Sequence, residues 1–81
     1  MSTSQLPLRR AMDVSKVVAI ARRAQGLTQA ELAARSGVST RWLSLFENRK
    51  TPGAELGKVL GVLTTLGVEV TATFDAGQPE A

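Results

Sequence analysis

The feature that most constrains the fold of this 81-residue chain is a helix that stops early. Residues 27–48 read LTQAELAARSGVSTRWLSLFEN, two stretches with helical apolar spacing separated by a single glycine, Gly37. Glycine adopts positive φ without a steric penalty, so it ends the first stretch and permits a tight turn. Ser39 then caps a second helix that runs to about Asn48, with Leu43 and Phe46 on its inner face. The pattern predicts two short helices at an angle.

The start of the first stretch carries the strongest local signal. Thr28 is followed three residues later by Glu31, the spacing of a capping box, in which each side chain accepts a hydrogen bond from a free backbone N–H. Leu27 before the cap and Leu32 after it have the spacing of a hydrophobic staple. A helix is therefore expected from Thr28 to the residue before Gly37.

Two further helices are expected on either side of this pair. Asp13 or Ser15 is the expected cap of the first, and Gly26 is its expected end. Pro52 lies in the loop RKTPG at 49–53, where it stops one helix and can open the next. The last helix is expected over about 54–66, with a buried stripe of Leu56, Val59, Leu60, Leu63 and Leu66.

Residues 68–74, VEVTATF, change from a helical period to an alternating one, which predicts a strand. A lone strand leaves its N–H and C=O groups unpaired, and no second strand is visible in the sequence. The expected mate is the same strand of another copy across a two-fold axis. The alternative is a frayed segment that packs against the last helix. The expected dimerisation residues are Val68, Val70, Ala72 and Phe74.

The expected fold class is all-α: a compact four-helix domain plus this short C-terminal strand. A domain of this size buries only about 60% of its unfolded surface, which favours a partner chain. The expected organisation is a flexible tail at 1–12, the helical domain at 13–67, the strand at 68–74 and a second tail at 75–81.

Composition argues against an enzyme. The chain has no Cys and no His, so thiolate metal sites and the commonest general base are absent. Glu31 is assigned to the capping box, and no convergent acid and base remain. We expect no metal, no cofactor and no catalytic residue. The longest apolar run, VVAIA at 17–21, is far shorter than the roughly 20 residues of a membrane span, and Arg9 and Arg10 lack the apolar run of an export signal. A cytoplasmic protein without membrane contact is expected.

A short helix, a glycine turn and a second short helix form a helix-turn-helix unit, whose second helix can enter the major groove of DNA. The alternative is an ordinary helical hairpin. The outward face of the second helix distinguishes them, because it carries donors and no acid. Arg41 can bond guanine O6 and N7, and Leu45 can meet a thymine methyl group or pack against the protein. The expected base contacts are Thr40, Arg41, Ser44 and Leu45.

Contacts to the DNA backbone should frame that helix, although the modest net charge of +3 does not by itself establish nucleic-acid binding. Gln29 lies at a helix N-terminus, where free N–H groups favour a phosphate. A solvated loop is the alternative for the two cations after the helix. Trp42 is expected at the edge of the core. The expected backbone contacts are Gln29, Ser39, Asn48, Arg49 and Lys50.

Residues 27–48 resemble the lambda-repressor and Cro-like, or XRE-type, helix-turn-helix domain, and the resemblance covers positions 14–66. It implies binding to operator DNA, usually as a dimer. It also implies a structural ion pair between Arg22 and Glu47, with no DNA role for either residue. The residues that carry the match are Thr28, Gln29, Leu32, Ala33, Gly37, Val38, Ser39, Ser44 and Glu47.

A narrower resemblance follows. FENRKTPGAELGKVLGVLTTLGVEVTATF is similar to antitoxins of the HipB type, in which FEN precedes a helical core that ends in a short pairing strand. The implied partner is a HipA-like serine/threonine kinase toxin, held in a complex that represses its own operon. Arg41 and Trp42 depart from this pattern, so the operator sequence is not implied. The competing hypothesis is a helix-turn-helix adaptor that contacts proteins and no DNA.

Overall fold

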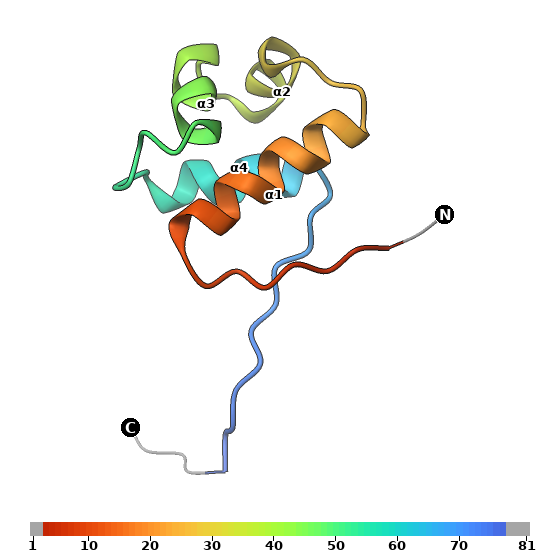
Figure 1. Cartoon of the computed structure of the whole chain (residues 1–81), viewed down its shortest axis with the longest axis vertical. Helices are drawn as coiled ribbons and strands as arrows, with labels where there is room; N and C mark the ends of the chain where they lie inside the picture. Colours follow the sequence, from red (N-terminus) through yellow and green to blue (C-terminus); the bar gives the residue numbers. More distant parts are fainter. Residues whose placement is uncertain (1–2, 78–81) are drawn as a thin grey trace.

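A computed structural model describes residues 3–77 of the chain. Within this range the chain forms four α-helices and no strand. Helices α2 and α3 lie together at one end of the molecule, and α1 and α4 cross beneath them (Figure 1). Both terminal segments leave from the side opposite α2 and α3. The helices are α1 (Ala11–Ala24), α2 (Gln29–Ser36), α3 (Thr40–Glu47) and α4 (Leu56–Thr65).

Helix α1 begins earlier than the sequence predicts. Neither Asp13 nor Ser15 is the cap; the helix begins at Ala11, and Asp13 is its third residue. The Asp13 carboxylate accepts hydrogen bonds from the backbone N–H groups of Arg9 and Arg10, each at 2.9 Å. These bonds also lower the pKa of Asp13. The third helical residue therefore reaches back to the N-cap residue Arg10 and the residue before it, which is the reverse half of a capping box.

The boundaries of α2 follow its local chemistry. Thr28 Oγ1 accepts from the Glu31 backbone N–H at 3.0 Å, and Glu31 Oε1 accepts from the Thr28 backbone N–H at 2.8 Å, so the predicted capping box is present. Gly37 ends the helix with φ of 73°, in the left-handed region that only glycine adopts without strain. The turn that follows sets α3 at an angle to α2 (Figure 1).

The core joins all four helices. Val18 of α1, Leu32 of α2, Leu43 of α3 and Val62 of α4 are completely buried. The other buried apolar residues are Ala33, Phe46, Val59, Leu63 and Leu66.

The predicted inner stripe of α4 is wrong at two positions. Leu56 and Leu60 are 68% and 43% exposed, whereas Val62, which was not predicted, is buried. Almost every residue of LGKVLGVL is apolar or glycine, so the periodicity fits more than one rotation of the helix. The helix is rotated so that Val59 and Val62 face the core, and its first helical residue is Leu56 rather than residue 54.

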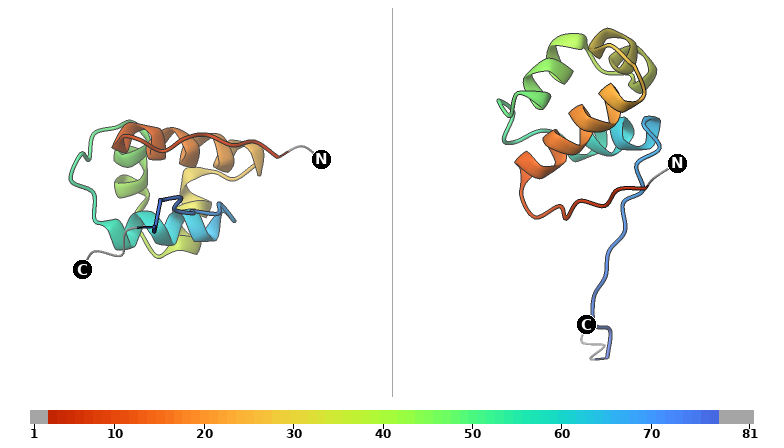
Figure 2. Two further views of the ribbon diagram at one scale, coloured as in Figure 1. Left: turned by 90° about the horizontal axis from the view of Figure 1, so that it is seen from below. Right: turned by 45° about the vertical axis from the view of Figure 1, so that its right-hand side comes forward.

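The predicted strand at 68–74 is also wrong for the single chain. Residues 68–74 form no strand, because a strand requires a hydrogen-bonded neighbour and residues 3–77 offer none. The Val68 N–H instead donates to Leu63 O at 2.9 Å, which completes the end of α4. From there the segment extends away from the helices (Figure 2).

Parts of the expected tails, residues 1–2 and 78–81, lie outside the described residues. Residues 3–10 and 68–77 are non-helical, and most of their side chains are exposed. No helix in the described range has the length and apolar character needed to cross a bilayer.

Candidate nucleic-acid interface

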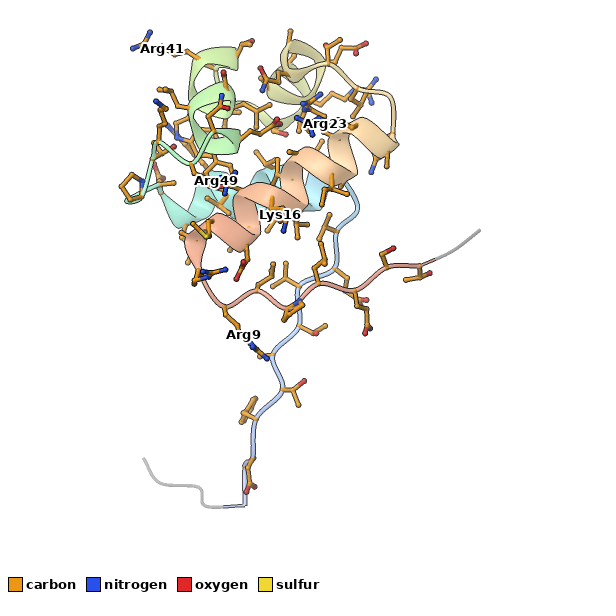
Figure 3. The ribbon with its side chains drawn as sticks, in the orientation of Figure 1. Arg9, Lys16, Arg23, Arg41 and Arg49 are labelled. Atoms are coloured by element: carbon orange, nitrogen blue, oxygen red, sulfur yellow. The ribbon has the colours of Figure 1, made fainter. Side chains whose placement is uncertain are left out.

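Helix α3 presents its N-terminal turn to solvent. Ser39 Oγ accepts from the Trp42 backbone N–H at 2.9 Å and so caps the helix. Thr40 and Arg41 are exposed, and Arg41 points away from the rest of the molecule (Figure 3). These two side chains are therefore available to a partner that approaches the start of α3.

The predicted base-contacting residues are not equally exposed. Ser44 and Leu45 are half-buried, in contrast to Thr40 and Arg41. For Leu45 this degree of burial is consistent with both interpretations, packing against the protein and contact with a thymine methyl group. The exposed donors are thus concentrated at the first turn of α3.

The opposite face of α3 is fixed by aromatic packing. The rings of Trp42 and Phe46 stack with centroids 5.1 Å apart and an interplanar angle of 7°. Lys58 Nζ of α4 lies 5.9 Å from the centre of the Trp42 ring, within the range of a cation–π interaction. Phe46 is buried and Trp42 is half-buried, so the tryptophan lies at the edge of the core.

An ion-pair network holds the C-terminal end of α3. Arg22 Nε and Nη2 donate to the two carboxylate oxygens of Glu47 at 2.7 and 2.9 Å. Arg22 Nη1 also donates to Leu27 O at 2.8 Å. The side chains of Arg22 and Glu47 are only 12% and 4% exposed. This bidentate geometry, which the resemblance implied, fastens α3 to α1 and to the turn before α2.

The charge state of Glu47 follows from the same contacts. Burial opposes its ionisation, but hydrogen bonds from Arg22 and Gln29 and the nearby charges of Arg22 and Arg23 outweigh burial and lower the pKa of Glu47. Glu47 is the single acid of α3, and it is neutralised inside the protein. The exposed surface of α3 consequently carries no negative charge.

Besides Ser39, two of the predicted backbone-contacting residues bond within the protein through their side chains. Gln29 Nε2 donates to Glu47 Oε1 at 3.1 Å, and Gln29 is half-buried. Asn48 Nδ2 donates to Ser44 O at 2.8 Å, the same carbonyl that accepts from the Asn48 backbone N–H at 3.1 Å at the end of α3. Each amide has a second N–H, so these bonds orient the two side chains without using all their donors.

Arg49 and Lys50 are exposed in the loop that follows α3. Arg49 has a φ of 61° and is the single non-glycine residue in the described range with positive φ. The Lys50 N–H donates to Leu45 O at 2.9 Å and the Arg49 N–H to Phe46 O at 3.0 Å, an arrangement in which glycine usually occupies the position of Arg49. The Arg49 side chain lies on the flank of the molecule beside α1 (Figure 3).

Arg23 is a cation near this interface that the sequence did not indicate. It is exposed at the end of α1, close to α2, and its charge acts on Glu47 (Figure 3). The packing of α1 against the other helices places Arg23 near the interface. Arg23 precedes the helix-turn-helix unit in the sequence, so no local pattern predicted this position.

The described residues contain no cluster of three or more side chains suited to hold a metal ion. The arrangement offers hydroxyl and guanidinium groups at the exposed start of α3, and guanidinium and ammonium groups in the loop after its other end. All of these are donors for bases and phosphates.

Two comparisons with known proteins agree with this geometry. A family model described as a helix-turn-helix domain matches residues 13–74. The chain is also 45% identical over 58 residues to the HTH-type transcriptional regulator y4mF of Sinorhizobium fredii, a match that spans 72% of this chain and 75% of the relative. The chain therefore belongs to the helix-turn-helix family of transcriptional regulators.

Proposed function

We propose that this protein is a sequence-specific DNA-binding repressor that acts as a homodimer, without enzymatic activity, in the cytoplasm. The observation that carries the proposal is the exposed first turn of α3, where Thr40 and Arg41 face solvent while Glu47 is sequestered in its ion pair. A DNA-reading helix needs an outward face with donors and no acid, and α3 has one.

In this proposal α3 lies in the major groove. Arg41 makes a bidentate contact to guanine, Thr40 and Ser44 bond base edges, and Leu45 meets a thymine methyl group. The DNA backbone is held at the two ends of the helix, at its N-terminal cap and in the loop after it. The backbone contacts are those of Gln29, Ser39, Asn48, Arg49 and Lys50.

Dimerisation is part of the proposal because a palindromic operator presents half-sites about 34 Å apart. The segment 68–74 is extended, and its exposed backbone is a template for pairing with a second copy. We place Val68, Val70, Ala72 and Phe74 at that interface. Val68 is half-buried against the core, which ties the start of the segment to α4.

The biological context that we propose is a toxin–antitoxin pair. The resemblance of residues 46–74 to antitoxins of the HipB type supports a HipA-like serine/threonine kinase as the partner. Co-expression with the product of the neighbouring gene, followed by size-exclusion chromatography, tests it. Elution of the two proteins as separate species would contradict the antitoxin role and leave the repressor role intact.

DNA binding is tested by gel shift with a fragment from upstream of the protein's own gene, at several salt concentrations. Binding should weaken steeply as salt rises. Arg41→Ala should cost about 1–3 kcal/mol, a loss of about 5- to 150-fold in affinity, and relax specificity at one base pair. Lys50→Ala should weaken all sequences similarly and lower the salt slope by about one.

Arg9→Ala is the matched control, since it removes the same side chain from an exposed position far from α3 (Figure 3). It should leave affinity almost unchanged. Equal effects of Arg41→Ala and Arg9→Ala would show that α3 does not read the operator. Absence of any shift at low salt would favour an adaptor that acts through protein contacts.

A further inference from the structure

An apolar groove lies where three parts of the fold meet. The start of α1, the loop at 49–55 and the start of α4 lie at the same end of the molecule (Figure 2). The walls include Val14 and Val59, the floor includes Phe46, and the volume is about 190 Å³. An apolar cavity of roughly 150 Å³ is large enough to bind benzene, so this groove can hold one aromatic ring.

The groove has a polar feature in an otherwise apolar lining. Thr51 borders it, and the Thr51 Oγ1 atom is buried with no hydrogen-bond partner among the described residues. A buried hydroxyl without a partner is uncommon and costs stability. Because this hydroxyl is buried in the single chain, it does not face the open groove, whose accessible lining is therefore apolar.

One end of the groove is basic. A second hollow of about 290 Å³ continues from it and shares Ala11, Thr51 and Pro52 with it. Arg10 and Arg49 border this second hollow, and both are exposed. Arg10 Nη2 also lies 3.4 Å from Asp13 Oδ1 in an exposed ion pair, so Arg49 is the cation of this end without an ion-pair partner among the described residues. The complementary occupant has an aromatic side chain followed closely by an acid.

The C-terminal segment has this chemistry. Phe74 is 77% exposed, the most exposed large apolar side chain of the described residues, and Asp75 follows it directly. Val70, on the same extended segment, is also exposed. Phe74 and Asp75 therefore match the apolar groove and its basic end in order and in charge.

The direction of the C-terminal segment indicates that it reaches the groove of a second copy rather than the groove of its own chain. The segment leaves the C-terminal end of α4 and runs away from the helices, whereas the groove lies at the N-terminal end of α4 (Figure 1). Two α4 helices packed antiparallel across a two-fold axis would place the C-terminal end of each beside the N-terminal end of the other. Helix α4 is about 15 Å long, and residues 68–74 span up to about 23 Å, so the segment can reach.

The outer face of α4 is suited to such packing. Leu56 and Leu60 are exposed on it, four residues apart. Gly57 and Gly61 have the same spacing, and a Cβ added at Gly61 would meet no atom of another described part of the chain within 4 Å. Glycine inside a helix costs about 1 kcal/mol of stability relative to alanine. Close approach of a partner helix would explain why α4 contains two glycines at this spacing.

We propose that, in the dimer, Phe74 of each copy inserts into the apolar groove of the other, with Asp75 lying against Arg10 and Arg49. This exchange rests on the proposed homodimer and specifies where the ends of its two C-terminal segments bind. Pairing of residues 68–73 across the axis is compatible with it, because paired strands carry each segment toward the opposite copy.

Sedimentation equilibrium of the full chain without DNA tests the exchange. Phe74→Ala should raise the dimer dissociation constant about 100-fold or more, because two rings per dimer lose their burial. The monomer fold should be unaffected, since Phe74 is exposed in the single chain. Leu6→Ala removes another exposed apolar side chain and is the control, with little expected change.

Filling the groove tests its side of the contact. Ala11 lines the groove from the exposed first turn of α1, so Ala11→Leu should occupy part of it and weaken the dimer. Combined with Phe74→Ala it should add almost nothing, since both remove one contact. Additive effects would overturn the exchange. A wild-type chain that stays monomeric would instead overturn the proposed dimer.

The absence of cysteine allows a direct test of which copy is occupied. A chain with Met12→Cys at the basic end of the groove and Ala76→Cys beyond Asp75 should oxidise to a covalent dimer. A monomer with an internal disulfide would show that the segment folds back onto its own groove and would overturn the exchange. Failure to form either disulfide, under conditions in which the dimer forms, would also overturn it.

Discussion

The helix-turn-helix unit and the C-terminal third of the domain differ in how fully a single chain covers them. In residues 27–48 the caps, the turn and the buried acid have partners within the chain. In residues 56–74 Leu56, Leu60 and Phe74 remain exposed. The polar groups named in the first region are satisfied within one chain, whereas the second region presents exposed apolar side chains, which the proposed dimer would cover.

The largest expected effect is at the ion pair. Glu47→Ala should lower the free energy of unfolding by about 3–5 kcal/mol, because it leaves the Arg22 guanidinium buried without its counter-charge. Urea denaturation measures the loss. Glu69→Ala, an exposed acid on the C-terminal segment, should change stability by less than about 0.5 kcal/mol. Similar losses of unfolding free energy in the two variants would show that the helix-turn-helix unit does not depend on its internal ion pair more than the C-terminal segment depends on its exposed acid.

A smaller effect is expected on acidification. The pKa of Glu47 lies below the ordinary value of 4.5, so between the two values the unfolded chain binds more protons and stability rises with pH. The contribution is complete above the unfolded value and is lost as pH falls through the folded one, by at most about 1.4 kcal/mol per pH unit.

Glu47→Gln isolates this contribution. Asp13 and Glu31 also have lowered pKa values and titrate in both proteins, so the difference between the two stability curves belongs to Glu47. The curves, from urea denaturation across the acid range, should converge as pH falls. A constant separation at every pH would contradict an ionised Glu47 in the folded state.

The smallest expected effects compare one substitution in both regions. Among the described residues, a Cβ added at Gly37 or Gly61 would meet no atom within 4 Å beyond its own neighbours in the chain and helix, so the backbone conformation decides the outcome. Gly37→Ala should destabilise by about 1 kcal/mol, because its φ of 73° is strained for alanine. Gly61→Ala lies inside a helix and should stabilise the monomer by up to about 1 kcal/mol.

In the proposed dimer the sign at Gly61 reverses, since the added methyl group separates the two α4 helices. Thermal unfolding at low and high protein concentration distinguishes the two states. A single sign for Gly61→Ala at all concentrations would argue against close packing of α4 on its mate.

Elements with local chemistry were predictable from the sequence. The capping box of Thr28 and Glu31 and the left-handed turn at Gly37 depend on residues within a few positions of each other. The pairing of Arg22 with Glu47 is long-range and came from the family resemblance, because no local pattern brings α1 and α3 together.

Elements that depend on tertiary packing were not predictable. The apolar character of α4 is nearly continuous, so the surrounding helices decide that Val62 faces the core and Leu60 does not. The start of α1 is a local exception, since Asp13 bonds residues only three and four positions earlier, Arg10 and Arg9, and the sequence analysis assigned Asp13 as a cap instead. The pattern of residues 68–74 fits a strand, but a strand exists only where another segment pairs with it.

Within the candidate interface, the sequence did not reveal how exposed each predicted side chain is or which of them bond within the protein. The sequence grouped Thr40, Arg41, Ser44 and Leu45 as outward residues, whereas the structure exposes the first two more fully. The sequence also did not predict the left-handed backbone of Arg49, because glycine or asparagine usually occupies that conformation.

The stacked pair of Trp42 and Phe46 gives the molecule a built-in optical probe. Trp42 is the sole tryptophan and the chain has no tyrosine, so its fluorescence reports a single location. Trp42 lies next to Thr40 and Arg41, which face the proposed operator. It also stacks on Phe46, which lines the floor of the groove. Emission from one indole can therefore follow DNA binding and chain association in separate, label-free titrations.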